Sequence, residues 1–403
     1  MKKIIYLLIA VLVLASCDKK TMTISISNQS DMAWNNDIAE VNLDELVKFE
    51  KETFLILDLA GQEVPYQITY DNKVIFPVTV KAHEVVNYQV KAGKPGEVKP
   101  MVFGKHYPER VDDIAWENDR IAFRTYGPAL QASGERAFGY DIWVKRVTDL
   151  VVENRYATEL NPETQAKIQE LRKTDPKAAQ ELANSISYHN DHGNGLDYYS
   201  VGPTLGAGTS ALLNANGDIV YPYCYKTYEI LDNGPLRFTV KLKYNPLAVD
   251  ESPKILETRL ISLDAGSQLN KISITYNNLL KSKTIVTGIV LHEPSEDYVA
   301  EAASGYIAYA DPAHPENGQT YIGAVFPADL NDAKAVKFSE EEKKDRKANG
   351  HVLAYSLCEP GSTYTYYAGG GWNKWGFNTS AEWFNYIKNY AAKVRQPLTI
   401  TVQ

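Results

Sequence analysis

Short runs in which apolar and polar residues alternate cover much of the chain, and this period of two predicts a protein built mainly of β-strands. In the first quarter such runs occupy residues 21–27, 39–43, 54–57, 67–70, 74–80 and 85–90. Turn-forming sequence, such as residues 58–61, lies where hairpins require it. The pattern predicts a small immunoglobulin-like β-sandwich over residues 21–95, and the glycine- and proline-rich residues 93–96 form the linker that follows.

Strand patterns continue from residue 102 to the C-terminus and are densest between residues 219 and 291. Helical patterns interrupt them in only a few places. Asn161 and Asp175 are N-capping residues that each precede a proline, and Thr379 with Glu382 forms a capping box. We expect a second, larger domain over residues 96–403, made of antiparallel β-sheets with a few short helices, in which residues 398–402 close the sheet.

The N-terminus has the pattern of an export signal. Lys2 and Lys3 precede an apolar run, residues 4–15, that is too short to span a bilayer. Residues 14–17 read Leu-Ala-Ser-Cys and resemble the bacterial lipobox, in which the cysteine becomes the lipidated first residue. The resemblance implies a signal peptide over residues 1–17, a lipid anchor at Cys17 that attaches the protein to a membrane, and a periplasmic or outer-membrane-associated location. Display at the cell surface is left open.

The amino-acid composition limits the classes of molecule that the protein is expected to bind. The net charge is −8 with acids and bases interspersed, so no basic stripe favours nucleic acid. The chain has 27 tyrosines against 11 phenylalanines, which suits a β-protein with a wet, aromatic-lined groove. Besides Cys17 there are two cysteines, Cys224 and Cys358. These two are either one disulfide or, more in keeping with their sequence context, small buried residues.

Residues 187–208 concentrate histidines, carboxylates and phenols between glycines, which allow tight turns and close approach to a ligand. Such a stretch is either a rigid structural turn or a binding and catalytic loop. On the second interpretation, a histidine takes a proton from the substrate and a tyrosine protonates the leaving oxygen. The candidate catalytic residues are His189, His192, Asp197 and Tyr198.

A second polar and aromatic region covers residues 107–146. Arg120 and Arg124 alternate with apolar residues and therefore share one face of a strand. That face is either a salt-bridged sheet surface or a patch that binds a carboxylate or sulfate on a sugar. Near the C-terminus, residues 364–375 form an aromatic, glycine-rich loop whose tryptophans either fill the core or stack on sugar rings. The candidate substrate-binding residues are Trp116, Glu117, Arg124, Glu135, Lys145, Tyr199 and Trp372.

Several segments resemble known families. The first domain is similar to the accessory sandwich of many glycan-processing enzymes. Residues 233–237 (Asn-Gly-Pro-Leu-Arg) and the charged run 257–270 resemble galactose-mutarotase-like sandwiches, which occur in mutarotases, polysaccharide lyases and some glycosidases. Residues 107–110, 115–119, 123–128 and 188–199 extend the match to a Bacteroidetes lipoprotein family of unknown function that occurs among polysaccharide-utilisation genes. The resemblance implies a galactose-mutarotase-like super-sandwich and a carbohydrate context, and no mechanism.

Several chemistries remain open. One is lyase-type elimination or hydrolysis of acidic, uronate-containing oligosaccharides; others are glycan binding without turnover and an aldose-epimerase-like activity. His292 and Glu293 resemble the acid and base of mutarotases in residue type, but a pair at the protein surface explains them as well. His189 and His192 lack the helical frame of a zinc site, so no metal or cofactor is expected. Calcium bound by Asp191, Asn194 and Asp197 is the alternative.

Overall fold

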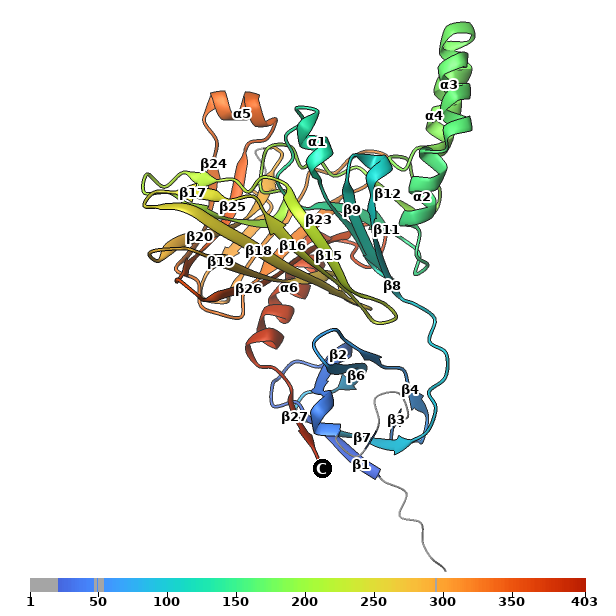
Figure 1. The fold of residues 1–403 in the computed structure, drawn as a ribbon, viewed down its shortest axis with the longest axis vertical. Helices are drawn as coiled ribbons and strands as arrows, with labels where there is room; N and C mark the ends of the chain where they lie inside the picture. Colours follow the sequence, from blue (N-terminus) through green and yellow to red (C-terminus); the bar gives the residue numbers. More distant parts are fainter. Residues whose placement is uncertain (1–20, 47–48, 50–53, 294–295) are drawn as a thin grey trace, which may run out of the picture.

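The computed structural model describes residues 21–46, 49, 54–293 and 296–403. The expected signal peptide and Cys17 therefore lie outside the described residues. Figure 1 shows a small β-domain, blue, below a much larger β-body, with the C-terminal strand returning to the small domain. The expected fold class, mainly β with a small sandwich before a large one and few helices, is confirmed.

The small domain packs one sheet, in the order β27-β1-β7-β3-β4, against another, β2-β6-β5. Alternate residues of these strands, such as Ile24 and Ile26, point inward and form the domain's core. Its elements are β1 (Thr21–Ser27), β2 (Trp34–Asn42), the short helix η1 (Leu43–Leu46), β3 (Phe54–Leu57), β4 (Glu63–Val64), β5 (Gln67–Ile68), β6 (Lys73–Val80), β7 (Val85–Ala92) and β27 (Thr399–Val402).

The C-terminal strand β27 departs from expectation. It pairs antiparallel with β1, with Ile24 opposite Val402, and so belongs to the small domain rather than to the large sheet. Alternation along a strand determines which side chains point inward, but it does not identify the neighbouring strand. The sequence therefore located this strand correctly and assigned it to the wrong domain.

The large body packs two antiparallel sheets face to face. One has the order β15-β16-β18-β19-β26-β23-β22-β21, with β17 paired to β18, and the other has the order β14-β13-β20-β25-β24. Their strands are β13 (Ala207–Leu213), β14 (Ile219–Val220), β15 (Tyr225–Asn233), β16 (Arg237–Tyr244), β17 (Leu247–Val249), β18 (Ser252–Asp264), β19 (Leu269–Asn277), β20 (Lys283–Leu291), β21 (Tyr298–Glu301), β22 (Tyr306–Ala310), β23 (Thr320–Val325), β24 (Asp332–Lys337), β25 (Gly350–Cys358) and β26 (Thr363–Trp372).

Helices are short and peripheral. The longest, α6 (Ser380–Arg395), lies on the outer face of the large sheet, and its buried residues include Trp383 and Ile387. The hydroxyl of Thr379 caps it by accepting from the Glu382 amide. Near the opposite end of the body lies α5 (Glu340–Arg346). Among the described residues, no helix is both long and apolar enough to cross a membrane.

A third sheet, in the order β12-β11-β10-β9-β8, packs on one end of the body, and we call it the site sheet. Its strands are β8 (Val102–Tyr107), β9 (Asp113–Asn118), β10 (Ile121–Thr125), β11 (Asp141–Lys145) and β12 (Gly195–Asp197). One face carries apolar residues such as Ile114, Phe123 and Ile142 into the main core. The other face lies under α2 (Val152–Glu159), whose Tyr156 is buried against it.

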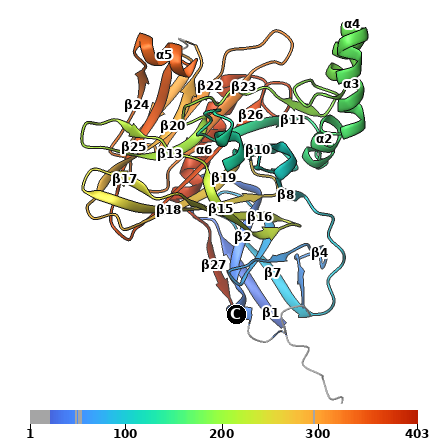
Figure 2. The same ribbon diagram turned by 45° about the horizontal axis from the view of Figure 1, so that its top comes forward.

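A helical hairpin of α3 (Pro162–Thr174) and α4 (Pro176–Ile186) projects from the body beside the site sheet, as Figures 1 and 2 show. Asn161 and Asp175 cap the two helices as predicted, each accepting a hydrogen bond from a backbone amide in the first turn. The hairpin leads directly into residues 187–194, the loop with both candidate histidines. The remaining short elements are η2 (Pro108–Arg110) and α1 (Pro128–Ala132).

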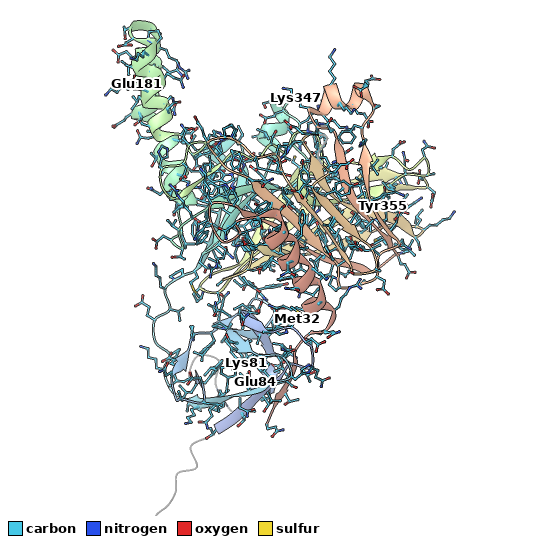
Figure 3. The ribbon with its side chains drawn as sticks, turned by 180° about the vertical axis from the view of Figure 1, so that it is seen from behind. Met32, Lys81, Glu84, Glu181, Lys347 and Tyr355 are labelled. Atoms are coloured by element: carbon cyan, nitrogen blue, oxygen red, sulfur yellow. The ribbon has the colours of Figure 1, made fainter. Side chains whose placement is uncertain are left out.

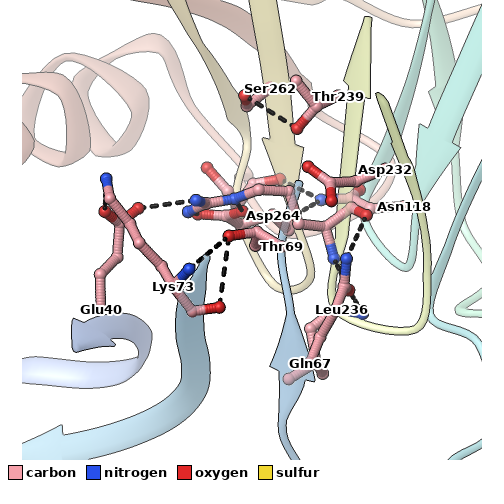
Figure 4. A network of polar contacts seen from close by, with 12 residues as sticks. Glu40, Gln67, Thr69, Lys73, Asn118, Asp232, Leu236, Thr239, Ser262 and Asp264 are labelled. Carbon is pink, nitrogen blue, oxygen red and sulfur yellow. Dashed lines mark hydrogen bonds and ion pairs between the residues drawn. The ribbon is translucent and has the colours of Figure 1, made fainter. Parts of the chain in front are cut away.

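The motif at residues 233–237 joins the two domains (Figure 4). Gln67 of the small domain accepts from the backbone amides of Leu236 and Arg237, each at 2.8 Å. The Arg237 guanidinium is 2.7 Å from Glu40 of the small domain and 2.5 Å from Asp264 of the body. Burial alone would lower the pKa of Arg237, but the combined effect of Asp264 and Glu40 is larger and raises it above its ordinary value. The guanidinium therefore stays charged. This segment thus works as an interdomain contact.

Candidate functional site

Four charged residues meet at one end of the site sheet. Asp113 and Asp141 begin β9 and β11, whereas Arg124 and Asp197 lie at the ends of β10 and β12. Because these strands are antiparallel, the four positions are adjacent, with Arg124 directly opposite Asp141 and Asp197 opposite Trp143. All four side chains lie on the same face and are buried. We call them the arginine–carboxylate cluster.

The guanidinium of Arg124 forms ion pairs with all three carboxylates of this cluster. Arg124 Nε is 2.8 Å from Asp141 Oδ2, and its Nη2 is 2.8 Å from Asp197 Oδ2. Its Nη1 lies 3.7 Å from Asp113 Oδ2 and has no hydrogen-bond partner among the described residues. Two hydroxyls complete the cluster, since Tyr126 donates to Asp141 and Tyr156 donates to Asp113. The carboxylates therefore outnumber the cations that touch them.

The excess of acid shifts the titration of the cluster. Burial raises the pKa of Asp113 to about 6, although Arg124 and Arg110 oppose the rise. Burial also raises the pKa of Asp197 well above its ordinary value, and the neighbouring Asp141 adds to the rise. Two carboxyl groups of the cluster therefore take up a proton more readily than ordinary aspartates, and pKa shifts of this kind are concentrated at functional sites.

His189 lies at the surface beside this cluster, with 53% of its side chain exposed. Its Nδ1 is 2.8 Å from the backbone carbonyl oxygen of Asp197 and 3.7 Å from Asp197 Oδ2. A carbonyl oxygen only accepts, so Nδ1 carries the hydrogen and Nε2 holds the free lone pair. Nε2 has no hydrogen-bond partner in the described part of the chain. This geometry makes His189 a base that faces solvent.

Arg110 and His189 both contact Tyr188. Arg110 Nε donates to the Tyr188 hydroxyl at 3.0 Å, and the Tyr188 and His189 ring centroids are 4.5 Å apart. Within the described residues, the two terminal nitrogens of Arg110 make no hydrogen bond or ion pair. A planar guanidinium with both terminal nitrogens free binds a carboxylate through two parallel bonds. Arg110 can therefore bind a carboxylate and His189 can accept a proton, and Tyr188 contacts both side chains.

The turn after Arg110 is strained. Val111 and Asp112 are both left-handed, with φ of 46° and 64°. A β-branched residue rarely adopts this conformation, and such a residue costs about 1–3 kcal/mol unless its surroundings impose it. The strained residues separate Arg110 from Asp113, so the turn fixes the guanidinium relative to the cluster. Strain of this kind is common at ligand sites.

Other candidate residues of the sequence have internal partners. Trp116 is buried between Phe123 and Phe238 and donates to Asn270 at 2.7 Å. Glu117 and Lys145 form a buried ion pair of 2.6 Å, and Glu117 also accepts from the backbone amides of residues 151 and 152 at the start of α2. These three side chains leave no exposed area for a sugar.

The remaining candidates are scattered. Trp372 is buried and donates to the Asn317 carbonyl, and Tyr198 accepts from the Thr320 hydroxyl at 2.7 Å. Tyr199 is buried with its ring against His292. Glu135 is exposed after α1, and His192 is exposed with its Nε2 2.9 Å from the Ser187 carbonyl. Of the predicted site residues, the structure brings together Arg124, Asp197 and His189.

The oxygens suggested for calcium already have partners. Asp191 accepts from the amides of Gly193 and Gly195 and pairs with Arg146 at 3.1 Å. Asn194 accepts from Arg155, and Asp197 accepts from Arg124. In the described ranges, no three histidine, cysteine or acidic residues are grouped so that they could hold a metal ion. Cys224 and Cys358 are buried and free.

His292 is part of a separate polar contact. It has 17% of its side chain exposed, with Nδ1 2.7 Å from Asp311 and Nε2 2.6 Å from the Ser200 carbonyl. Both neighbours are acceptors, so both ring nitrogens must donate and the ring is positively charged. Burial is the largest single influence and lowers the pKa of His292, but the hydrogen bond and charge of Asp311, the Ser200 carbonyl and Glu293 together outweigh it, so the pKa is raised. His292 thus ties the loop around Ser200 to the body, and Glu293 beside it is exposed.

This contact predicts a pH-dependent stability. Because folding raises the pKa of His292, its contribution is present below the unfolded value of about 6.5 and is lost as pH rises through the folded value. We expect His292→Gln to lower the unfolding free energy by about 1–2 kcal/mol at pH 5.5 and by less at pH 9. Denaturant titrations at both pH values measure this. The exposed pair His83–Asp31 supplies the control, since His83→Gln should change little at either pH. An equal loss at both pH values would contradict the charged state.

The arrangement described so far, two packed antiparallel sheets with a small β-domain, occurs in carbohydrate enzymes. An α-mannosidase from Enterococcus faecalis superposes with a TM-score of 0.51 at 9% identity, over 95% of this chain and 46% of that one. A glycosyl hydrolase family 38 protein from the same species superposes with a TM-score of 0.51 at 10% sequence identity. The superposition covers 95% of this chain and 47% of that protein. The chain spans about half the length of both, and at such identities the likeness concerns the fold.

Residues 26–400 match the family described as domain of unknown function DUF4861, and the chain belongs to that family. A relative from Formosa agariphila, "Uncharacterized protein P7", is 26% identical over 425 residues, which cover 99% of this chain and 98% of the relative. The expected membership of a family of unknown function, with a relative in the Bacteroidetes, is thereby confirmed.

Proposed function

We propose that this protein is an exported lipoprotein that cleaves acidic, uronate-containing oligosaccharides by elimination. The carrying observation is that Tyr188 contacts both His189, whose Nε2 is free, and Arg110, whose terminal nitrogens are unpaired among the described residues. Residues 14–17 and the apolar run before them support export and lipid anchoring at Cys17. The fold shared with an α-mannosidase and a glycosyl hydrolase family 38 protein supports a carbohydrate substrate.

The chemistry uses an acid substituent on the sugar. Arg110 binds the uronate carboxylate and neutralises its charge. The neutralised group can accept the negative charge that develops at C5, and the C5 hydrogen therefore becomes more acidic. His189 Nε2 takes that proton, the C4–oxygen bond breaks, and a C4–C5 double bond forms. The imidazolium then gives the proton to the departing oxygen, which returns His189 to its neutral form. The Asp197 carboxyl group, 3.7 Å from Nδ1, stabilises the imidazolium between these two steps whenever it is ionised.

Hydrolysis fits the geometry less well. It requires two carboxyl groups about 5–9.5 Å apart with the glycosidic bond between them. Asp191, in the same loop as His189, is held by two backbone amides and by Arg146. Three other carboxylates near His189, namely Asp113, Asp141 and Asp197, are buried around one guanidinium. They have no exposed area on which a sugar could lie. Elimination by a single exposed histidine needs no second carboxylate.

His189→Gln tests the proposal. We expect its rate on uronate oligosaccharides to fall by about 10²–10⁴, because it loses the proton acceptor. The measurement is the ultraviolet absorbance of the new double bond, with product sizes checked by chromatography. The melting temperature should change little, since the side chain is half exposed. His192→Gln, in the same loop, is the matched control and should keep full activity.

Other results would separate the competing functions. Shorter products without the absorbance would indicate hydrolysis, and binding without any product would indicate a glycan-binding protein. Full activity in His189→Gln would overturn the assigned base.

A further inference from the structure

A pocket of about 600 Å³ lies between the small domain and the large body. The small domain contributes Trp34 and the rest of residues 32–40, the large sheet contributes Lys271 and Tyr367, and α6 contributes Tyr386 and Tyr390. Figure 3 shows Met32, another lining residue, at this junction. Its volume falls in the range typical of small-molecule sites, which occur preferentially at domain interfaces.

The lining combines aromatic surfaces with a polar group that lacks a partner. Trp34, Tyr367, Tyr386 and Tyr390 all line the pocket, and aromatic rings are the groups on which the apolar C–H faces of a sugar pack. Trp34 Nε1 is fully buried and has no hydrogen-bond partner in the described ranges. An unpaired buried donor is costly, and a bound molecule that accepts its hydrogen bond is one way to remove that cost. The wall is therefore amphipathic, as sugar sites are.

The lining contains three carboxylates and three cations, and most of them are paired with one another. Arg237 is neutralised by Glu40 and Asp264, and Lys393 is 2.8 Å from Asp37. Lys271 also lines the pocket, but its amine makes no ion pair or hydrogen bond with any described residue. The Lys271 amine lies near Glu40. Burial alone would raise the pKa of Glu40, but the charges of Arg237 and Lys271 help to lower it to about 2. Lys271 thus gives the pocket an ammonium group whose hydrogen bonds are free for a ligand, and an acidic group on that ligand would pair with it.

We propose that this pocket is a second saccharide site, which binds an acidic sugar through the Lys271 amine and the aromatic wall. None of its lining residues belongs to the site sheet or to the loop that carries His189, so it goes beyond the proposed elimination and stands without it. The pocket joins residues of both domains, and an occupant consequently holds the small domain against the body. Such a site would keep a charged polysaccharide on the protein between cleavage events.

The test measures saccharide binding by calorimetry in the double variant His189→Gln, Arg110→Met, which removes the first site. The probes are uronate disaccharides, sulfated disaccharides and neutral disaccharides. Adding Lys271→Met should weaken the acidic probes by about tenfold or more and leave the neutral ones unchanged. Lys254→Met, an exposed lysine on the same sheet outside the pocket, is the control and should have no effect.

The two acidic probes separate carboxylate from sulfate as the preferred group. Saturable binding of either that depends on Lys271 supports the site. Equal binding of acidic and neutral probes, no saturable binding, or an unchanged affinity in Lys271→Met overturns it. Because turnover is absent in every variant used, these outcomes are independent of whether the protein is a lyase.

Discussion

Replacing Arg124 by methionine is expected to destabilise the fold by about 3–5 kcal/mol, the usual effect of removing one partner from a buried ion pair. Methionine fills a similar volume but leaves Asp141 and Asp197 buried without the guanidinium that now lies 2.8 Å from each. Chemical denaturation of the purified variant measures the loss. Arg136→Met is the matched control, because Arg136 pairs with Asp345 at a site where both are about half exposed. Its expected change is within about 1 kcal/mol.

A compensating variant distinguishes charge from packing. If the uncompensated carboxylates cause the loss, then adding Asp141→Asn and Asp197→Asn to Arg124→Met should restore much of the stability, since amides need no counter-charge. A loss that persists in the triple variant would mean that the guanidinium contributes mainly through packing against Trp143 and Tyr126, whose rings lie 5.2 and 5.1 Å from it.

Arg124 also illustrates what sequence can and cannot predict. Alternation along residues 120–125 correctly indicates a strand, but that strand begins at Ile121, so Arg124 lies on its face and Arg120 lies in the bend before it. An arginine that binds substrate and one that binds internal carboxylates look the same in sequence, because the chemistry of the guanidinium is identical in both. Asp197, its partner, is 73 residues away and becomes a neighbour only when β11 joins β10 to β12. Folding therefore decides the role.

The same reasoning separates the successful parts of the fold prediction from the rest. Strand positions and the caps at Asn161 and Asp175 depend on local sequence and could be predicted. The pairing of β27 with β1 depends on contacts across the whole chain and could not. Trp116 and Trp372 were ambiguous for a different reason, since an indole buries as much area in a core as it offers to a sugar.

The site itself was predictable only in part. His189 stood out because histidines, carboxylates and glycines cluster around it, and the structure places it at the surface beside Asp197. Arg110, Asp113 and Asp141 were not singled out as site residues. Their signal was positional: each charged residue begins or precedes an apolar run, where strand ends collect at one edge of a sheet. The strained Val111 between Arg110 and Asp113 had no signal in the sequence.

Asp113→Asn should show how much the buried carboxylate of Asp113 lowers the free energy of unfolding. Folding raises the pKa of Asp113 from 3.8 to about 6, which corresponds to about 3 kcal/mol against ionisation in the folded state. The native protein binds this proton more tightly than the unfolded chain, so stability falls as pH rises from about 4 to 6 and stays lower above that. Asparagine cannot ionise and retains an oxygen that can accept from Tyr156.

We therefore expect Asp113→Asn to match the parent near pH 4 and to exceed its unfolding free energy by up to about 3 kcal/mol at pH 8. Urea titrations across this range measure the difference. Tyr156→Phe should act in the opposite direction, because it removes the hydroxyl that donates to the Asp113 carboxylate at 3.2 Å, and should steepen the loss of stability with pH. An Asp113→Asn protein less stable than the parent at pH 8 would show that Arg124 repays the burial of this charge. A gain in stability accompanied by a loss of activity would instead indicate that the carboxylate is kept for proton handling beside His189, since residues that a fold retains at a cost are commonly functional.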